Sequence, residues 1–161
     1  MTPAPMIDRT DTASPASPGR RETQTFQTRD AELRKMSDWF RRFAAESALP
    51  EGRALDMELC LNEILTNINH YAHRESDGER EIQVTLHRQD RRLEATIEDD
   101  GLPFNPVESP EPSAPESLAQ ARIGGWGIPI VRALADEVRY ERRDGRNRLV
   151  LLFSSAEPTA R

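Results

Sequence analysis

The chain has 161 residues, of which 36% are hydrophobic and 31% charged, and its formal net charge is −6. This length allows one domain with a core of its own. The acidic balance argues against a sequence-independent nucleic-acid binder, which needs excess Lys and Arg to neutralise phosphates. The longest apolar run, 149–153, is too short to span a membrane, and no secretory signal is visible. A single cysteine, Cys60, fits a reducing compartment. We therefore expect a cytoplasmic protein with no direct contact to membrane or nucleic acid.

The N-terminal segment is rich in Thr, Pro, Ser and Ala and poor in apolar residues. Such a segment cannot offset its ordering entropy, so we expect a disordered tail over 1–21. The ordered domain is expected over 22–154, with a short C-terminal tail over 155–161. An alternating run at 23–26 is typical of an edge strand at the start of this domain.

Two helices are predicted next. Apolar residues recur every three or four positions over 30–47, and Leu49-Pro50 ends this helix. A second helix is predicted from about Glu51 to Ala72. Its buried stripe is expected to consist of Leu55, Leu59, Ile64, Leu65 and Ile68.

The remainder predicts four strands and a third helix. The strands are expected over 82–86, 93–97, 138–141 and 148–153. The first pair is joined at 89–91, the second pair at 143–147, and the helix is expected over 126–135. A proline-rich stretch at 105–122 is a long loop, which inside a compact domain is usually functional or disordered. This order predicts an α+β fold, a two-layer α/β sandwich with the helices on one face of a largely antiparallel sheet.

Glu63 and Asn67 are four residues apart in the second predicted helix, so both lie on one helix face. A carboxylate can polarise a hydroxyl or a water, and an amide oxygen one turn away can ligate Mg²⁺. The pair alone is more typical of an ordinary solvated helix face.

Asp99 is predicted at the end of a strand, two residues before Gly101. A carboxylate there can accept hydrogen bonds from an exocyclic amine, and the glycine lets the backbone approach a flat ring. By itself this segment is also compatible with an ordinary Asp-Gly turn.

Gly124, Gly125 and Gly127 gather at the start of the third predicted helix. Backbone N–H groups at a helix start favour an anion such as phosphate. The alternative is a flexible hinge, and no Gly-Lys-Ser/Thr sequence follows, so this is not a P-loop.

The order of these three segments resembles the GHKL (Bergerat-fold) ATPases of the HATPase_c_2 type, and within them the anti-sigma factor serine-protein kinases of bacteria. Residues 63–67 resemble the N box of the family, 99–104 its Asp-x-Gly-x-Pro-Phe box, and 124–127 its second glycine box. The resemblance covers 22–153, and its specificity comes from the ordered set.

The resemblance implies a role for each segment in binding Mg-ATP. Glu63 would be the general base that accepts a proton from a partner serine. Asn67 would coordinate the Mg²⁺ that bridges the phosphates. Asp99 would accept from the adenine amine, with Gly101 packed beside the ring.

The glycine segment and the loop before it would hold the phosphates. Gly124, Gly125 and Gly127 would donate N–H groups, and the loop 105–123 would close as a lid over ATP. To these we add Arg122 as a ligand of the γ-phosphate, because a guanidinium suits phosphate.

Two residues depart from the family pattern. Asn105 stands where Asp is usual, and Trp126 stands where a smaller apolar residue is common. Neither change removes a predicted ligand, although both positions border the lid. Binding therefore depends on several residues, whereas catalysis depends on Glu63.

The function that the resemblance implies is an ATP-dependent serine-protein kinase that acts as an anti-sigma factor in a bacterial partner-switching system. It would bind a sigma factor and phosphorylate a STAS-type anti-anti-sigma protein, and a homodimer is a further expectation. The alternative is a nucleotide-gated binding module that regulates a partner without phosphoryl transfer. The catalytic domain of a sensor histidine kinase is disfavoured, because no phosphoacceptor helix pair is visible before the domain.

Overall fold

The computed structural model describes residues 19–75, 79–108 and 127–154. In chain order its elements are β1 (Arg20–Gln27), α1 (Asp30–Glu46), α2 (Glu51–Glu75), β2 (Glu81–Gln89), β3 (Arg92–Asp99), α3 (Gly127–Leu134), β4 (Glu137–Arg143) and β5 (Arg146–Ser154). The strand β1 begins two residues before the expected start of the domain. None of the described helices is long and apolar enough to cross a membrane.

The five strands form one antiparallel sheet with the order β1-β2-β3-β5-β4. The strand β1 lies at one edge, as predicted, and β4 lies at the other. The last hairpin turns at Asp144 and Gly145, both with positive φ, which matches the twist of the flanking strands. This turn is shorter than the predicted 143–147, because β4 and β5 stay paired up to Arg143 and Arg146.

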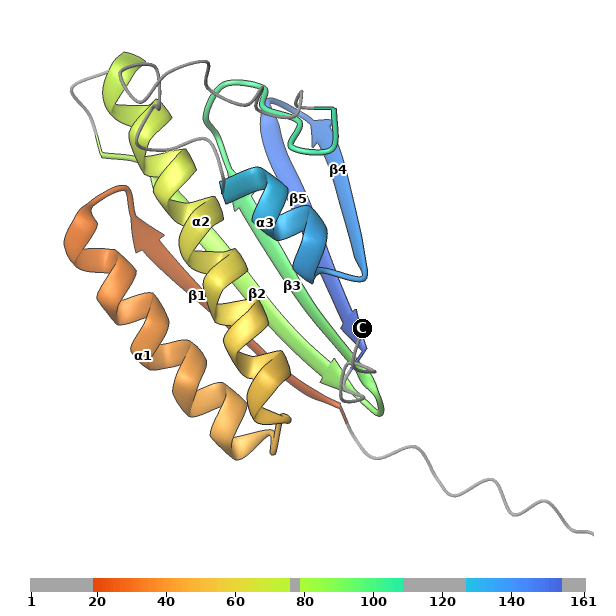
Figure 1. Cartoon of the computed structure of the whole chain (residues 1–161). Helices are drawn as coiled ribbons and strands as arrows, with labels where there is room; N and C mark the ends of the chain where they lie inside the picture. Colours follow the sequence, from red (N-terminus) through yellow and green to blue (C-terminus); the bar gives the residue numbers. More distant parts are fainter. Residues whose placement is uncertain (1–18, 76–78, 109–126, 155–161) are drawn as a thin grey trace, which may run out of the picture.

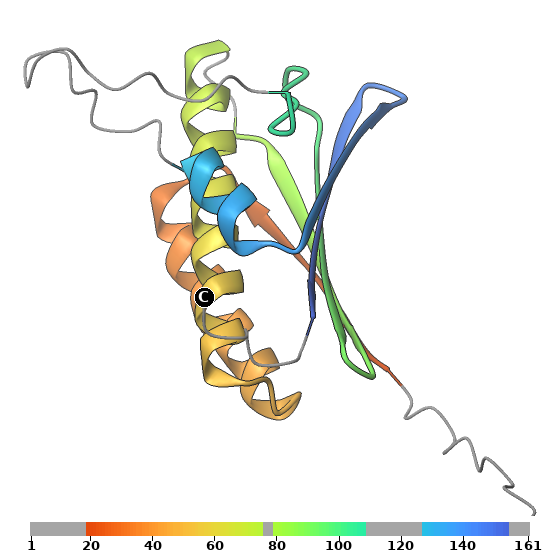
Figure 2. The ribbon, with the colours of Figure 1, turned by 45° about the vertical axis from the view of Figure 1, so that its right-hand side comes forward.

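The three helices cover one face of the sheet, and α2 lies between α1 and α3 (Figure 1). Figure 2 shows the helices and the sheet as two layers. The core fills the space between them, and its largest fully buried side chains include Phe26, Phe40, Phe43 and Phe153. The expected α+β sandwich is therefore confirmed.

The buried side of α2 differs from the prediction. Leu55 and Leu59 are 60% and 42% exposed, whereas Ile64 and Leu65 are buried as predicted. Among the side chains of α2 that the structure describes, up to residue 70, the other buried apolar ones are Met57, Cys60 and Leu61. The prediction was wrong at the first two leucines because apolar residues surround this helix, and α1, α3 and the sheet together decide which of them are covered.

Candidate functional site

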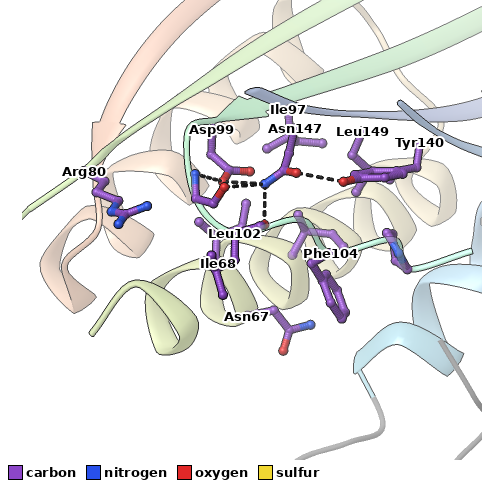
Figure 3. Close-up of a pocket in the computed structure, with 13 residues that line it drawn as sticks. Asn67, Ile68, Arg80, Ile97, Asp99, Leu102, Phe104, Tyr140, Asn147 and Leu149 are labelled. Carbon is purple, nitrogen blue, oxygen red and sulfur yellow. Dashed lines mark hydrogen bonds between the residues drawn. The ribbon is translucent and has the colours of Figure 1, made fainter. Parts of the chain in front are cut away.

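A pocket opens between α2 and the sheet, at the end of β3 (Figure 3). The helix contributes Ile64, Asn67 and Ile68, the sheet contributes Ile97, Asp99, Tyr140, Asn147 and Leu149, and the connecting segments contribute Arg80, Gly101, Leu102, Phe104 and Pro106. The space between these residues is about 640 Å³ when the solvent at its open mouth is included. Most of these side chains are apolar, so the few polar groups decide what can bind.

Asp99 is the acidic group of this pocket and is buried, with 6% of its surface exposed. It ends β3 on the same face as Ile97, because alternate strand residues share a face. Its Oδ1 accepts hydrogen bonds from the Gly101 N–H at 2.8 Å and from Asn147 Nδ2 at 3.0 Å. Its Oδ2 accepts none from the described residues. One carboxylate oxygen is thus fixed by the protein, and the other can accept a bond from a ligand.

Asn147 is a residue of the site that the sequence analysis missed. Its Nδ2 also donates to the Leu102 carbonyl at 2.8 Å, while its Oδ1 accepts from Tyr140 Oη at 2.8 Å (Figure 3). The same Oδ1 accepts from Arg142 Nη1 at 2.8 Å. A guanidinium only donates, so the oxygen of the amide must face Arg142 and its NH₂ group must face Asp99. The alternation of β5 places this residue on the inner face, but only the pairing of β3 with β5 brings it opposite Asp99.

Gly101 lies where a larger residue does not fit. A Cβ atom on it would lie 2.7 Å from Asp99 Oδ1. Its carbonyl accepts from Arg142 Nη1 at 2.9 Å, and the neighbouring Asp100 carbonyl accepts from Arg80 Nη1 at 3.2 Å. The loop after β3 is therefore held by side chains from two different parts of the chain.

Glu63 and Asn67 lie on α2, on the other side of the pocket from the sheet. Asn67 lines the pocket, and Glu63 packs against Gly127, the first residue of α3. A Cβ atom on Gly127 would lie 2.4 Å from Glu63 Oε2. The fold thus brings the acid of α2 to the start of α3, where the helix dipole favours a negative group.

The predicted phosphate ligands fall partly outside the described residues. Arg122, Gly124 and Gly125 lie there, as does most of the predicted lid 105–123. Their roles stay predictions.

The first residues of that loop are described and are anchored. Asn105 Oδ1 accepts from the Val107 N–H at 2.9 Å, and the Pro106 carbonyl accepts from Arg132 Nε on α3 at 3.0 Å. A carboxylate could accept the same bond from Val107, so Asn in place of the usual Asp leaves this turn intact.

The described residues of the site offer few ligands for a metal ion. Among the described residues, no group of three or more His, Cys, Asp or Glu side chains could hold a metal ion. Mg²⁺ is commonly bound by one or two protein oxygens together with substrate phosphates and waters. The Asn67 amide at the pocket fits such a partial ligand set.

Comparison with known sequences gives the same family as the sequence motifs. The model of the histidine kinase-like ATPase domain family matches residues 26–153. The serine/threonine-protein kinase BtrW of Bordetella bronchiseptica is 30% identical over 119 residues, which cover 73% of this chain and 82% of BtrW. The serine-protein kinase RsbW of Listeria innocua is 30% identical over 95 residues, which cover 56% of this chain and 59% of RsbW.

Solved structures support the fold. The RsbU and RsbW domains of Rv1364c from Mycobacterium tuberculosis align with a TM-score of 0.59 and 17% identity, over 84% of this chain and 32% of that chain. The SiaB-SiaC complex from Pseudomonas aeruginosa aligns with a TM-score of 0.55 and 15% identity, over 81% of this chain and 88% of the matched chain. At these identities the likeness concerns the fold alone.

Proposed function

Because the chain belongs to the histidine kinase-like ATPase domain family, we propose that it is an ATP-dependent serine-protein kinase that acts as an anti-sigma factor in a partner-switching system. The observation that carries this proposal is the free oxygen of Asp99 in an apolar pocket, opposite Asn67 on α2. Two relatives that bear the name of serine-protein kinases support the transfer reaction.

The pocket suits adenine. Asp99 Oδ2 accepts a hydrogen bond from the exocyclic amine, while apolar side chains such as Ile97 and Leu149 pack against the ring. Guanine carries a carbonyl oxygen at the corresponding position, so it would bring an acceptor against a carboxylate. The site therefore prefers ATP to GTP.

Asn67 and Glu63 have different roles in the proposed reaction, the first in cation binding and the second in proton transfer. The Asn67 amide oxygen would hold Mg²⁺, which would supply positive charge beside the phosphates. Glu63 accepts the proton of the partner's serine hydroxyl as the serine oxygen forms a bond to the γ-phosphorus. The bond from the γ-phosphorus to the bridging oxygen breaks, and ADP leaves. The predicted N–H donors Gly124, Gly125 and Gly127 and the guanidinium of Arg122 complete the phosphate site.

The partners follow from the same proposal. The protein substrate is a STAS-type anti-anti-sigma protein phosphorylated on serine, and the sequestered regulator is a sigma factor. A homodimer remains part of the proposal.

The reaction is tested by incubating the protein with γ-labelled ATP, Mg²⁺ and each purified STAS protein encoded in the same genome. Glu63→Gln should abolish serine labelling. Glu58→Gln is the matched control, because Glu58 lies on the same helix but pairs with Arg41. Tight ATP binding with no labelling of any STAS protein would reject the kinase and favour a nucleotide-gated binding module.

The cation role of Asn67 needs its own test. Asn67→Ala should weaken ATP binding in the presence of Mg²⁺ but leave binding in EDTA nearly unchanged, as measured by titration calorimetry. Asn62→Ala on the same helix is the control, since its side chain bonds to Ser37 on α1. An equal loss with and without Mg²⁺ would contradict the assigned role.

A further inference from the structure

Four large apolar side chains are exposed in the part of the chain that the structure describes, and they lie in two places. Leu102 and Val107 belong to the segment after β3 that borders the pocket. Leu55 and Leu59 lie on α2 and do not line the pocket. The nucleotide site therefore gives no reason for this second pair.

The second pair lies on the outward face of α2. The helix α1 packs along one side of α2, where Arg41 Nη2 and Glu58 Oε1 are 2.8 Å apart. The helix α3 packs along the other side, where its first residue meets Glu63. The sheet covers the buried face (Figure 1). Leu55 and Leu59 are thus exposed between two neighbouring helices.

This face leads directly to the proposed base. Leu59 and Glu63 are four residues apart, so they are separated by about 6 Å along the helix axis and about 40° around it. Leu55 continues the same line one turn further from the active site. A protein that presents a hydroxyl to Glu63 therefore comes within reach of both leucines.

We propose that Leu55 and Leu59 form the docking surface for the protein substrate, the one whose serine gives its proton to Glu63. This inference rests on the proposed function. Beside this face α1 exposes Arg34 and Arg41, and Arg41 is paired with Glu58 of α2. The matching partner surface therefore carries an apolar contact with an acidic residue placed to meet Arg34.

A second copy of the chain is a poorer occupant. A stable protein interface buries about 800 Å² on each partner, far more than two leucine side chains can supply. A small apolar contact beside the reacting group suits a substrate that must leave after transfer, since a few central residues carry most of the binding energy.

The test compares Leu59→Glu and Leu55→Glu with the wild type. The control is Thr25→Glu, which adds the same charge on the opposite face of the sheet, because its neighbour Phe26 points into the core. The probes are the purified STAS proteins of the same genome, used in steady-state phosphorylation and in direct binding by biolayer interferometry. Leu59→Met keeps an apolar side chain and should behave like the wild type.

Leu59→Glu should raise KM for the STAS protein at least about tenfold, and Leu55→Glu should raise it less. The value of kcat and the affinity for ATP should change by less than about twofold, because only substrate binding is lost. Thr25→Glu should leave all three unchanged. A KM that is unaffected by both leucine substitutions would overturn the proposal.

Two further outcomes separate this proposal from the proposed function. If the wild type labels no STAS protein, the kinase fails, but a STAS protein bound by the wild type and not by Leu59→Glu still supports the docking surface. The docking proposal is overturned if the wild type and Leu59→Glu bind the STAS protein equally well, or if the wild type binds no STAS protein. Sedimentation that shows a wild-type dimer dissociated by Leu59→Glu also overturns it, by assigning the face to a second copy.

Discussion

Replacing Asp99 with Asn tests the pocket with almost no change in shape. The amide has one oxygen and one NH₂ group, and neither orientation suits the site. If the oxygen keeps the bonds from the Gly101 N–H and from Asn147, the NH₂ group faces the amine of adenine, donor against donor. If the amide turns over, its NH₂ group faces the two protein donors instead.

The expected loss follows from these contacts. A lost hydrogen bond to a charged group costs about 1.5–3 kcal/mol, and a buried donor left without an acceptor costs about 1–3 kcal/mol. A total near 3 kcal/mol would weaken ATP binding about 100-fold, since each 1.4 kcal/mol is a factor of ten. GTP should lose less, because an NH₂ group in the pocket can donate to the guanine carbonyl.

Titration calorimetry with Mg-ATP and Mg-GTP measures both effects on the wild type and on Asp99→Asn. The control is Asp100→Asn, since Asp100 is exposed and only its backbone carbonyl is bonded to Arg80. Thermal unfolding of each variant establishes that the protein is folded. Wild-type affinity for ATP in Asp99→Asn, or an equal loss for both nucleotides, would refute the assignment of the adenine contact.

Gly101→Ala would bring a methyl group to 2.7 Å from Asp99 Oδ1, so ATP affinity should fall at least about tenfold in calorimetry; an unchanged affinity would mean that the loop moves aside without cost. Leu61→Ala should lower the free energy of unfolding by about 2–5 kcal/mol, and Leu55→Ala by less than about 1 kcal/mol, in urea denaturation. Equal effects would contradict the assigned faces of α2. Burial, with the nearby carboxylates, raises the pKa of the Cys60 thiol to about 12, so at pH 8 the thiol stays protonated and should react with a thiol reagent only after unfolding. Rapid modification of the native protein would show that α2 opens locally.

Local patterns were enough to predict the elements of the fold. The three- and four-residue spacing over α1 and the alternation in β2 and β3 depend only on neighbours along the chain, and both are confirmed. The buried face of α2 could not be predicted in the same way. Leu55 and Leu61 are both apolar positions on one helix, and only the packing of α1 and α3 decides that the second is covered.

In the candidate site, too, some residues could be predicted from local sequence and others depend on contacts between distant segments. Asp99, Gly101 and Asn67 could be proposed from motifs because each lies in a short segment of recognisable composition. Asn147 could not, since its contribution depends on the cross-strand register that pairs it with Asp99. The available signal was a polar residue in line with the apolar inward positions Leu149, Leu151 and Phe153, because such a side chain needs a buried partner.

The place of β5 in the sheet has a consequence for biosynthesis. It is the last strand along the chain, yet it lies between β3 and β4, and it supplies Asn147 to Asp99. A chain emerging from the ribosome therefore exposes β3 as an open edge until β5 has been synthesised. The pocket is complete only in molecules whose β5 is in place, and nucleotide at 100 times its Kd would stabilise those molecules by about 2.7 kcal/mol.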